Sequence, residues 1–305
     1  MNRLNKLFIA FDNWQQKHPA ASFPIAVNKK YSEDRAGNLA ALLTYYGFLS
    51  IFPLLLVLTT VIRILPIHNR LRIKLLANLT HYVPVIGSDL QRNIHGLHHS
   101  GLDLAIVIVI TIYGMRGVAN AIQNTLNHLW LVPNKDRPGF PRNTLRSIGI
   151  VIVSGVGFIL TAALSTYAAT LGRSIPVSVF TDLLSFGILL GTLILVFKIG
   201  IGGKQRTRKL LAGSLIAAIA LQIIQILGGL IVTRELNHLS SLYGLFAAVL
   251  GLIFWLYLIA QVALYAIETT AVETLRLWPR SLTTAVQPTK ADQKTLYGYQ
   301  KRDSL

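Results

Sequence analysis

The sequence predicts an all-α integral membrane protein, a six-transmembrane-helix bundle with amphipathic interfacial helices. Its 305 residues are 52% hydrophobic and only 13% charged, whereas about a quarter of the residues in soluble domains are charged. The mean hydropathy is +0.53. Six segments are long and apolar enough to cross the ~30 Å of hydrocarbon in a bilayer. Basic residues gather on alternate links between these segments, as in proteins that cross a membrane several times.

The six predicted spans cover residues 39–65, 102–124, 147–171, 180–200, 210–232 and 244–268. They define a transmembrane domain over 37–275. A cytoplasmic amphipathic segment (1–36) precedes it, and a polar cytoplasmic tail (276–305) follows it. We expect the tail to be mobile, because polar chain ends without an apolar face are usually poorly ordered.

The N-terminal segment carries apolar residues at helical spacing, namely Leu4, Leu7, Phe8, Phe11 and Trp14. Such a stripe predicts a short amphipathic helix. The pattern fits a helix lying on the membrane surface and a helix packed on the protein's own loops equally well.

The first predicted span contains a break. Pro53 has no backbone N–H to donate and frees the carbonyl one turn earlier, and Ser50 can bond to a backbone carbonyl and bend the helix. Proline is tolerated in a transmembrane helix where neighbouring groups satisfy the freed carbonyl. We interpret Ser50 and Pro53 as a kink, which serves packing or opens the backbone toward a wet cavity.

The link at 66–101 predicts two amphipathic helices on the outer face. His95, His98 and His99 lie there at a spacing that can place imidazoles on one helix face, which is compatible with Zn²⁺. Only Asp89 and Asp103 are near in sequence. An exposed polar face therefore explains the histidines better, and we expect no metal or other cofactor.

The distribution of basic residues predicts the orientation. Most of the 29 lysines and arginines fall in the two terminal segments and in the links after spans two and four. This asymmetry places both termini in the cytoplasm. It also explains the net charge of +17 without nucleic acid, because no basic face with base-stacking residues is recognisable.

Polar residues inside the spans are the candidate functional residues. One stripe follows span two, and further members lie on spans five and six: Arg116, Asn120, Gln123, Asn124, Asn127, Gln222, Gln225, Gln261 and Glu268. Such residues avoid lipid. They either hydrogen-bond between helices and hold the bundle together, or they line a hydrophilic cavity that opens inward. We further expect Arg116 and Glu268 to form a charge pair, or to share a site, at the inner end of the cavity.

Four stretches resemble the YihY/BrkB family of membrane proteins. They are "NLAALLTYYGFLSIFPLLLVL" (38–58), "AIQNTLNHLW" (121–130) followed by "DRPGF", "KLLAGSLIAAIALQI" (209–223) and "YGLFAAVLGLIFWLYLIAQVALYAIETTAVE" (243–273). The last stretch departs from the family pattern, since the Gly of its Gly-Ala-Glu triplet is replaced in Tyr265-Ala266-Ile267-Glu268, although Glu268 is in place. The resemblance implies a six-helix protein of the bacterial inner membrane. Members of that family have also been labelled ribonuclease BN.

The leading functional hypothesis is transport or translocation of an unidentified substrate, an anionic amphiphile such as a lipid being one candidate. The alternative is a non-transporting scaffold that binds a protein partner or anionic lipid. A ribonuclease ranks third, because the 12 acidic residues are scattered and form no catalytic cluster of the kind a metal-dependent nuclease needs. We therefore expect no enzyme. The expected partners are membrane lipids, and the small residues of the spans are compatible with a homo-oligomer.

The orientation is testable with topology reporters. Fusions at Leu305 and near Lys135 and Arg206 should report a cytoplasmic location, and fusions near His95 and Asn237 an external one. Cytoplasmic signal from the 66–101 link would contradict the six-span topology.

Overall fold

The computed structural model describes residues 3–64, 116–170, 175–202, 207–283 and 286–304, and within these ranges the chain is helical without any strand. A helix covers residues 116–129. The other elements are α1 (Arg3–Lys17), α2 (Pro19–Glu33), α3 (Ala36–Ile64), the 3₁₀ turn η1 (Asn134–Asp136), α7 (Arg142–Thr170), α8 (Ile175–Gly200), α9 (Thr207–Leu275) and α10 (Lys290–Asp303).

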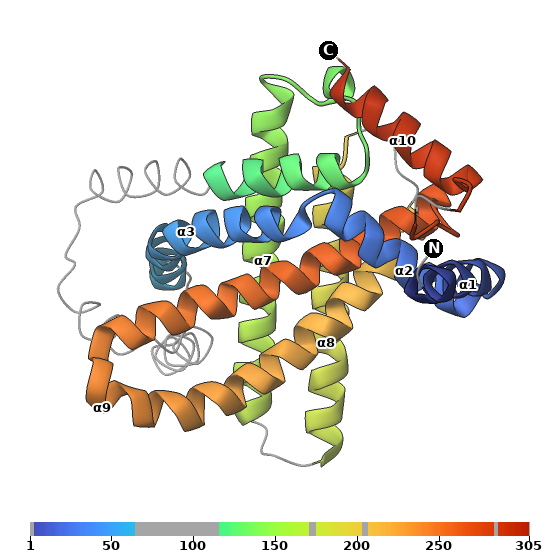
Figure 1. Cartoon of the computed structure of the whole chain (residues 1–305). Helices are drawn as coiled ribbons and strands as arrows, with labels where there is room; N and C mark the ends of the chain where they lie inside the picture. The colour runs from blue at the N-terminus through green and yellow to red at the C-terminus, as the bar shows by residue number, and fades with distance from the viewer. Residues whose placement is uncertain (1–2, 65–115, 171–174, 203–206, 284–285, 305) are drawn as a thin grey trace.

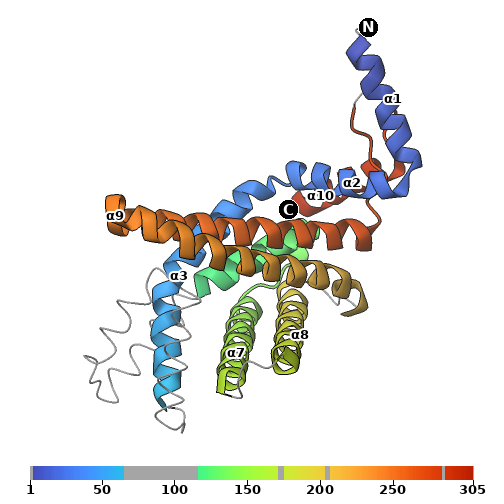
Figure 2. The same ribbon diagram turned by 90° about the horizontal axis from the view of Figure 1, so that it is seen from below.

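The helices form two crossing sets. α7 and α8 lie side by side, and they cross the direction of α9 steeply (Figure 1). α9 folds back at its far end, so that its two arms run next to each other (Figures 1 and 2). The arms touch at Gly213, where an added Cβ would lie 1.2 Å from Thr270 Oγ1. Only glycine permits so close an approach at this position.

Four helical segments are long and apolar enough to cross a membrane: Arg142–Leu164, Pro176–Gly200, Thr207–Ile224 and Val249–Leu275. Ala36–Ile51 is a shorter apolar helix. Each of the last four predicted spans therefore overlaps one of these helical segments. The predicted link between the fifth and sixth spans is itself helical, since α9 is continuous through residues 233–243. The count of six spans stays a prediction, because the outer part of span two and the whole 66–101 link, with its three histidines, lie outside the described residues.

α3 is bent. Figure 2 shows its second half turning away from the direction of its first half, as the serine and proline pattern predicts. Ser50 Oγ donates a hydrogen bond to the Gly47 carbonyl at 2.7 Å, a contact of the type that bends helices. Pro53 lies within the same helix.

The two terminal segments gather at one end of the molecule. Figure 2 shows α1, α2, α10 and the last turns of α9 at the same end. The apolar stripe of α1 remains exposed, with Leu7 at 67% and Phe8 at 60% of their possible accessible surface. The side of the membrane on which the two ends lie stays a prediction.

The expectation of a mobile tail is wrong for residues 286–304. α10 begins with a capping box in which the Thr289 side chain and the Asp292 side chain each satisfy a backbone N–H of the other residue. Thr295 and Arg302 are buried against the body of the protein. The tail is ordered because its contacts are polar and ionic, a form of docking that apolar periodicity does not reveal.

Candidate functional site

A buried ion cluster joins three helices at the end of the molecule where the termini meet. Its centre is Lys30 on α2, which has no accessible surface. The Lys30 Nζ donates to Asp34 Oδ2 at 2.5 Å, to Glu268 Oε2 at 2.7 Å and to the Leu129 carbonyl at 2.7 Å. These three acceptors match the three donors of an ammonium group, so the lysine is fully satisfied.

Arg302 on α10 extends this cluster to the tail. Its Nη1 donates to Asp34 Oδ1 at 2.8 Å and lies 3.2 Å from His128 Nε2. Burial and the neighbouring Arg302 cation lower the pKa of His128 below its ordinary value, so the imidazole is neutral at pH 7. Two cations, Lys30 and Arg302, then face two carboxylates, Asp34 and Glu268. Arg302 also pairs with Asp303 at 2.9 Å, so each cation of the cluster has at least one acidic partner, as buried cations require.

The predicted pair of Arg116 and Glu268 is wrong. The carboxylate of Glu268 binds Lys30 instead, while Arg116 Nη2 donates to Thr144 Oγ1 at 3.2 Å. The reason is distance along the helix. Lys30 Nζ bonds to both Glu268 and the Leu129 carbonyl, so these two groups lie close together. Arg116 precedes Leu129 by ~20 Å along its helix, at 1.5 Å per residue.

The polar stripe of span two is largely hydrogen-bonded within the bundle. Ser147 Oγ on α7 donates to Asn120 Oδ1 at 2.7 Å, and Gln123 Nε2 donates to Ser147 Oγ at 2.6 Å. Asn127 bonds to the end of α8, donating to the Gly200 carbonyl and accepting from the Gly202 N–H. Asn124 faces outward and is exposed. Three of the predicted residues therefore hold helices together.

The candidates on spans five and six differ in their surroundings. Gln261 accepts a hydrogen bond from Tyr31 Oη and donates to Tyr257 Oη at 2.6 Å. The Tyr31 ring also stacks on that of Tyr265, with centroids 3.9 Å apart. Gln222 is half-buried, and the side chain of Gln225 lies outside the described part of the chain.

Some buried polar atoms have no partner among the described protein groups. They include Arg116 Nε, Gln123 Oε1 and Glu268 Oε1. Buried groups of this kind usually bond to ordered water or to a ligand. The described groups alone thus leave part of the stripe and of the ion cluster without hydrogen-bond partners.

A second ionic group fixes the segment between α9 and α10, and we refer to it as the tail clamp. Its members are Asp12, Lys29, Glu33, Arg280 and Asp292. Arg280 donates to both carboxylate oxygens of Glu33, at 2.7 and 3.0 Å, and to Asp292 Oδ1 at 2.9 Å. Asp12 on α1 accepts backbone N–H bonds from Leu282 and Thr283 at 2.9 and 3.1 Å.

The tail clamp shifts the titration of its acids. Burial would raise the pKa of Asp292, but hydrogen bonds from Ser281, Thr289, Arg280 and Lys29 outweigh it and hold that pKa well below its usual range. Burial likewise acts to raise the pKa of Asp12, and its hydrogen bonds, beginning with those from Gln15 and Gln16, lower it overall. Both acids are therefore ionised at pH 7.

Sequence reasoning missed Lys30, Asp34, Arg302 and the tail clamp. One local signal was present, since Lys30 and Asp34 have the i, i+4 spacing that brings opposite charges together on a helix. The contacts to Glu268 and Arg302 join residues far apart in the chain and leave no such signal.

These features define an all-helical membrane protein. Buried ion pairs hold together the end of the molecule at which its two terminal segments meet. The sequence model of the virulence factor BrkB family matches residues 27–288, and the chain belongs to this family.

Two curated relatives extend the comparison. The chain is 24% identical over 274 residues to a UPF0761 membrane protein of Aeromonas salmonicida (strain A449), covering 84% of this chain and 90% of the relative. It is 21% identical over 265 residues to a UPF0761 membrane protein of Psychrobacter sp. (strain PRwf-1), covering 82% of this chain and 48% of the relative. The chain thus spans about half the length of the Psychrobacter protein. No solved structure matches the sequence.

Proposed function

We propose that this protein translocates an anionic amphiphile of the lipid class across the bacterial inner membrane. The observation that carries the proposal is Arg116. It lies within predicted span two, its Nη2 bonds to a neutral hydroxyl, and its Nε is buried without a partner among the described groups. A cation within the apolar part of a membrane protein requires an anion, a group of carbonyls or water. A phosphate or carboxylate of a passing amphiphile would satisfy it.

One oxygen of Gln123 and one of Glu268, which have no partner among the described residues, support the same proposal. Both oxygens are buried; Gln123 lies on the same stripe as Arg116, and Glu268 belongs to the ion cluster. Water that bonds to them would provide a hydrated route for a headgroup, since buried water bridges polar groups that the protein leaves unsatisfied.

The second candidate is a scaffold that moves no substrate. It is favoured by the bonds of Asn120, Gln123 and Asn127, which join the helix at 116–129 to α7 and to the end of α8. A stripe that is closed by side-chain bonds stabilises a bundle without opening a path.

Reconstituted vesicles separate the two functions. The purified full chain is placed in liposomes that contain a fluorescent phosphatidylglycerol, and a membrane-impermeant quencher reports the fraction of probe that changes leaflet, with and without an imposed membrane potential. We expect transfer above that of protein-free vesicles. Arg116→Gln should reduce its rate about tenfold, the effect of losing ~1.4 kcal/mol of stabilisation of the anion during transfer.

Arg142→Gln is the matched control, because Arg142 is an exposed arginine at the start of α7 and the charge change is the same. Its rate should equal that of the unmodified protein. Transfer no faster than in protein-free vesicles under either condition would eliminate the translocation proposal and leave the scaffold.

A further inference from the structure

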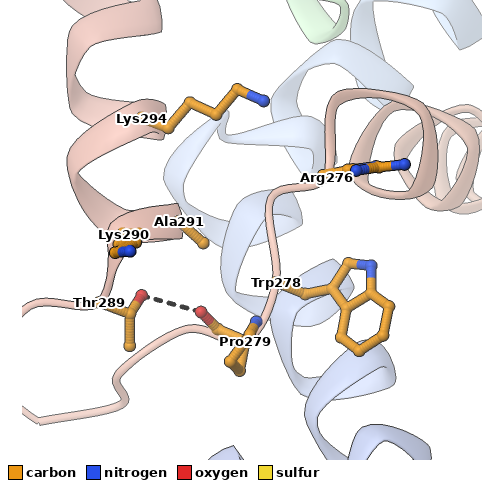
Figure 3. Close-up of a pocket in the computed structure, with 7 residues that line it drawn as sticks. All are labelled: Arg276, Trp278, Pro279, Thr289, Lys290, Ala291 and Lys294. Atoms are coloured by element: carbon orange, nitrogen blue, oxygen red, sulfur yellow. Dashed lines mark hydrogen bonds between the residues drawn. The ribbon is translucent and has the colours of Figure 1, made fainter.

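A pocket of ~410 Å³ lies between the chain that leaves α9 and the beginning of α10 (Figure 3). It is lined by Arg276, Trp278, Pro279, Thr289, Lys290, Ala291 and Lys294. Ligand pockets in proteins usually have volumes of roughly 300–1,000 Å³. The space is therefore adequate for a polar headgroup, although not for a whole lipid.

The charged residues of this pocket are all cations. Arg276, Lys290 and Lys294 contribute three positive charges, and no acidic residue is among the lining residues. In the described part of the chain neither Arg276 nor Lys290 forms an ion pair, and Lys294 Nζ donates only to the Leu275 carbonyl at 2.6 Å. The nearby carboxylate of Asp292 is already engaged by Lys29 and Arg280. These cations thus remain available to an anion from outside.

The wall of the pocket is held in place. Trp278 packs edge-on against Phe23 of α2, with ring centroids 5.8 Å apart. Thr289 Oγ1 donates to the Pro279 carbonyl at 2.8 Å, as the dashed line in Figure 3 shows. The tail clamp fixes the adjoining residues. The pocket is therefore formed before a ligand arrives, which reduces the entropy that binding must overcome.

The location of the pocket points to the membrane surface as the source of the anion. Arg276 directly follows Val249–Leu275, one of the four candidate spans, and the residues that follow a spanning helix lie near the membrane surface. Tryptophan and basic residues concentrate at this level of membrane proteins. The cytoplasmic leaflet carries anionic lipids that attract basic groups.

We infer that this pocket binds the phosphate headgroup of an anionic lipid from the cytoplasmic leaflet. Arg276, Lys290 and Lys294 line different sides of the pocket (Figure 3) and would attract the phosphate through their combined positive charge, and the indole of Trp278 would face the apolar part of the lipid next to the headgroup. The inference rests on the proposed function for the class of ligand. It adds the place where that ligand is captured before it reaches Arg116.

Native mass spectrometry of the full chain, released from an uncharged detergent, tests the inference. The protein is titrated with phosphatidylglycerol and with phosphatidylcholine. We expect one phosphatidylglycerol to bind at about tenfold lower concentration than the zwitterionic lipid. The triple variant Arg276→Gln, Lys290→Gln, Lys294→Gln should lose this preference. These side chains are exposed, so the substitutions are compatible with folding.

The matched control is Lys17→Gln, Lys135→Gln, Lys301→Gln, which removes three exposed cations outside the pocket and changes the net charge equally. It should keep the preference. Equal loss of binding in both triple variants would overturn the inference in favour of general charge attraction. Displacement of the lipid by inorganic phosphate at an equal concentration would also overturn it, by identifying a soluble anion as the ligand. Lipid binding is measured whether or not the protein transfers lipid between leaflets. A negative vesicle assay would therefore count against translocation and not against this binding site.

Discussion

Replacing Lys30 with methionine should destabilise the folded protein by about 3–5 kcal/mol, the usual cost of removing one partner from a buried ion pair. The Lys30 side chain is completely buried between Asp34 and Glu268. Without it, Glu268 loses its only described ion-pair partner, and its buried carboxyl group must either stay charged in an apolar site or take up a proton, and both cost stability. Asp34 keeps Arg302. The change should therefore act mainly through the uncompensated carboxylate of Glu268.

Thermal unfolding of the detergent-solubilised protein, followed by size-exclusion fluorescence, measures this effect. Lys135→Met is the control, because Lys135 is exposed, and its midpoint should remain close to that of the unmodified chain. Adding Glu268→Gln to Lys30→Met removes the stranded charge and should recover part of the loss. If the double variant is less stable than Lys30→Met alone, the ion-pair explanation is wrong, and Glu268 stabilises the protein through another contact.

The spans could be predicted from the sequence because the signal for a membrane helix is local. A window of apolar residues specifies a helix of sufficient length whatever its neighbours are, and the segments around Ile150, Leu190 and Leu264 were placed in this way. The serine and proline of α3 likewise predicted its bend, because each acts on the helix that contains it.

The ion cluster could not be predicted in the same way. Glu268 was recognised as a functional candidate because it is an acid in an apolar segment, but its partner was misassigned. The position of a residue along its own span does not identify its partner, and the actual partner, Lys30, is 238 positions away on a helix outside the predicted spans. The packing of α2 against α9 decides that contact, and neither sequence segment specifies it alone.

The ordered tail is an intermediate case. Thr289 and Asp292 have the three-residue spacing of a capping box, so the beginning of α10 was recognisable. The docking of α10 was not, because it depends on Arg302 reaching Asp34 and on the tail clamp. A polar helix that docks through ion pairs needs no apolar stripe, so its sequence resembles that of a solvated tail.

Arg280→Ala should release this tail while leaving the spans folded. The Arg280 side chain is only 4% exposed and holds Glu33 and Asp292 together. We expect a loss of about 3 kcal/mol, at the lower end for a buried pair because Glu33 still reaches water. Docking of α10 should weaken by about a hundredfold, since each 1.4 kcal/mol is a factor of ten. Hydrogen exchange of the amides in α10 measures this, and Lys301→Ala, an exposed change on the same helix, is the control.

The pH dependence of the same exchange measurement provides a second readout. Because the folded state lowers the pKa of Asp292 from its ordinary value of 3.8, its contribution is fully present above that value and is lost as the pH falls through the lowered pKa. The unmodified tail should therefore stay docked from neutral pH down to about pH 4 and loosen only in stronger acid. In Arg280→Ala one of the hydrogen bonds that lower this pKa is missing, so acid release should begin at higher pH than in the unmodified protein. An unchanged acid profile in Arg280→Ala, together with unchanged exchange at neutral pH, would show that Asp12 and Lys29 hold the tail without Arg280.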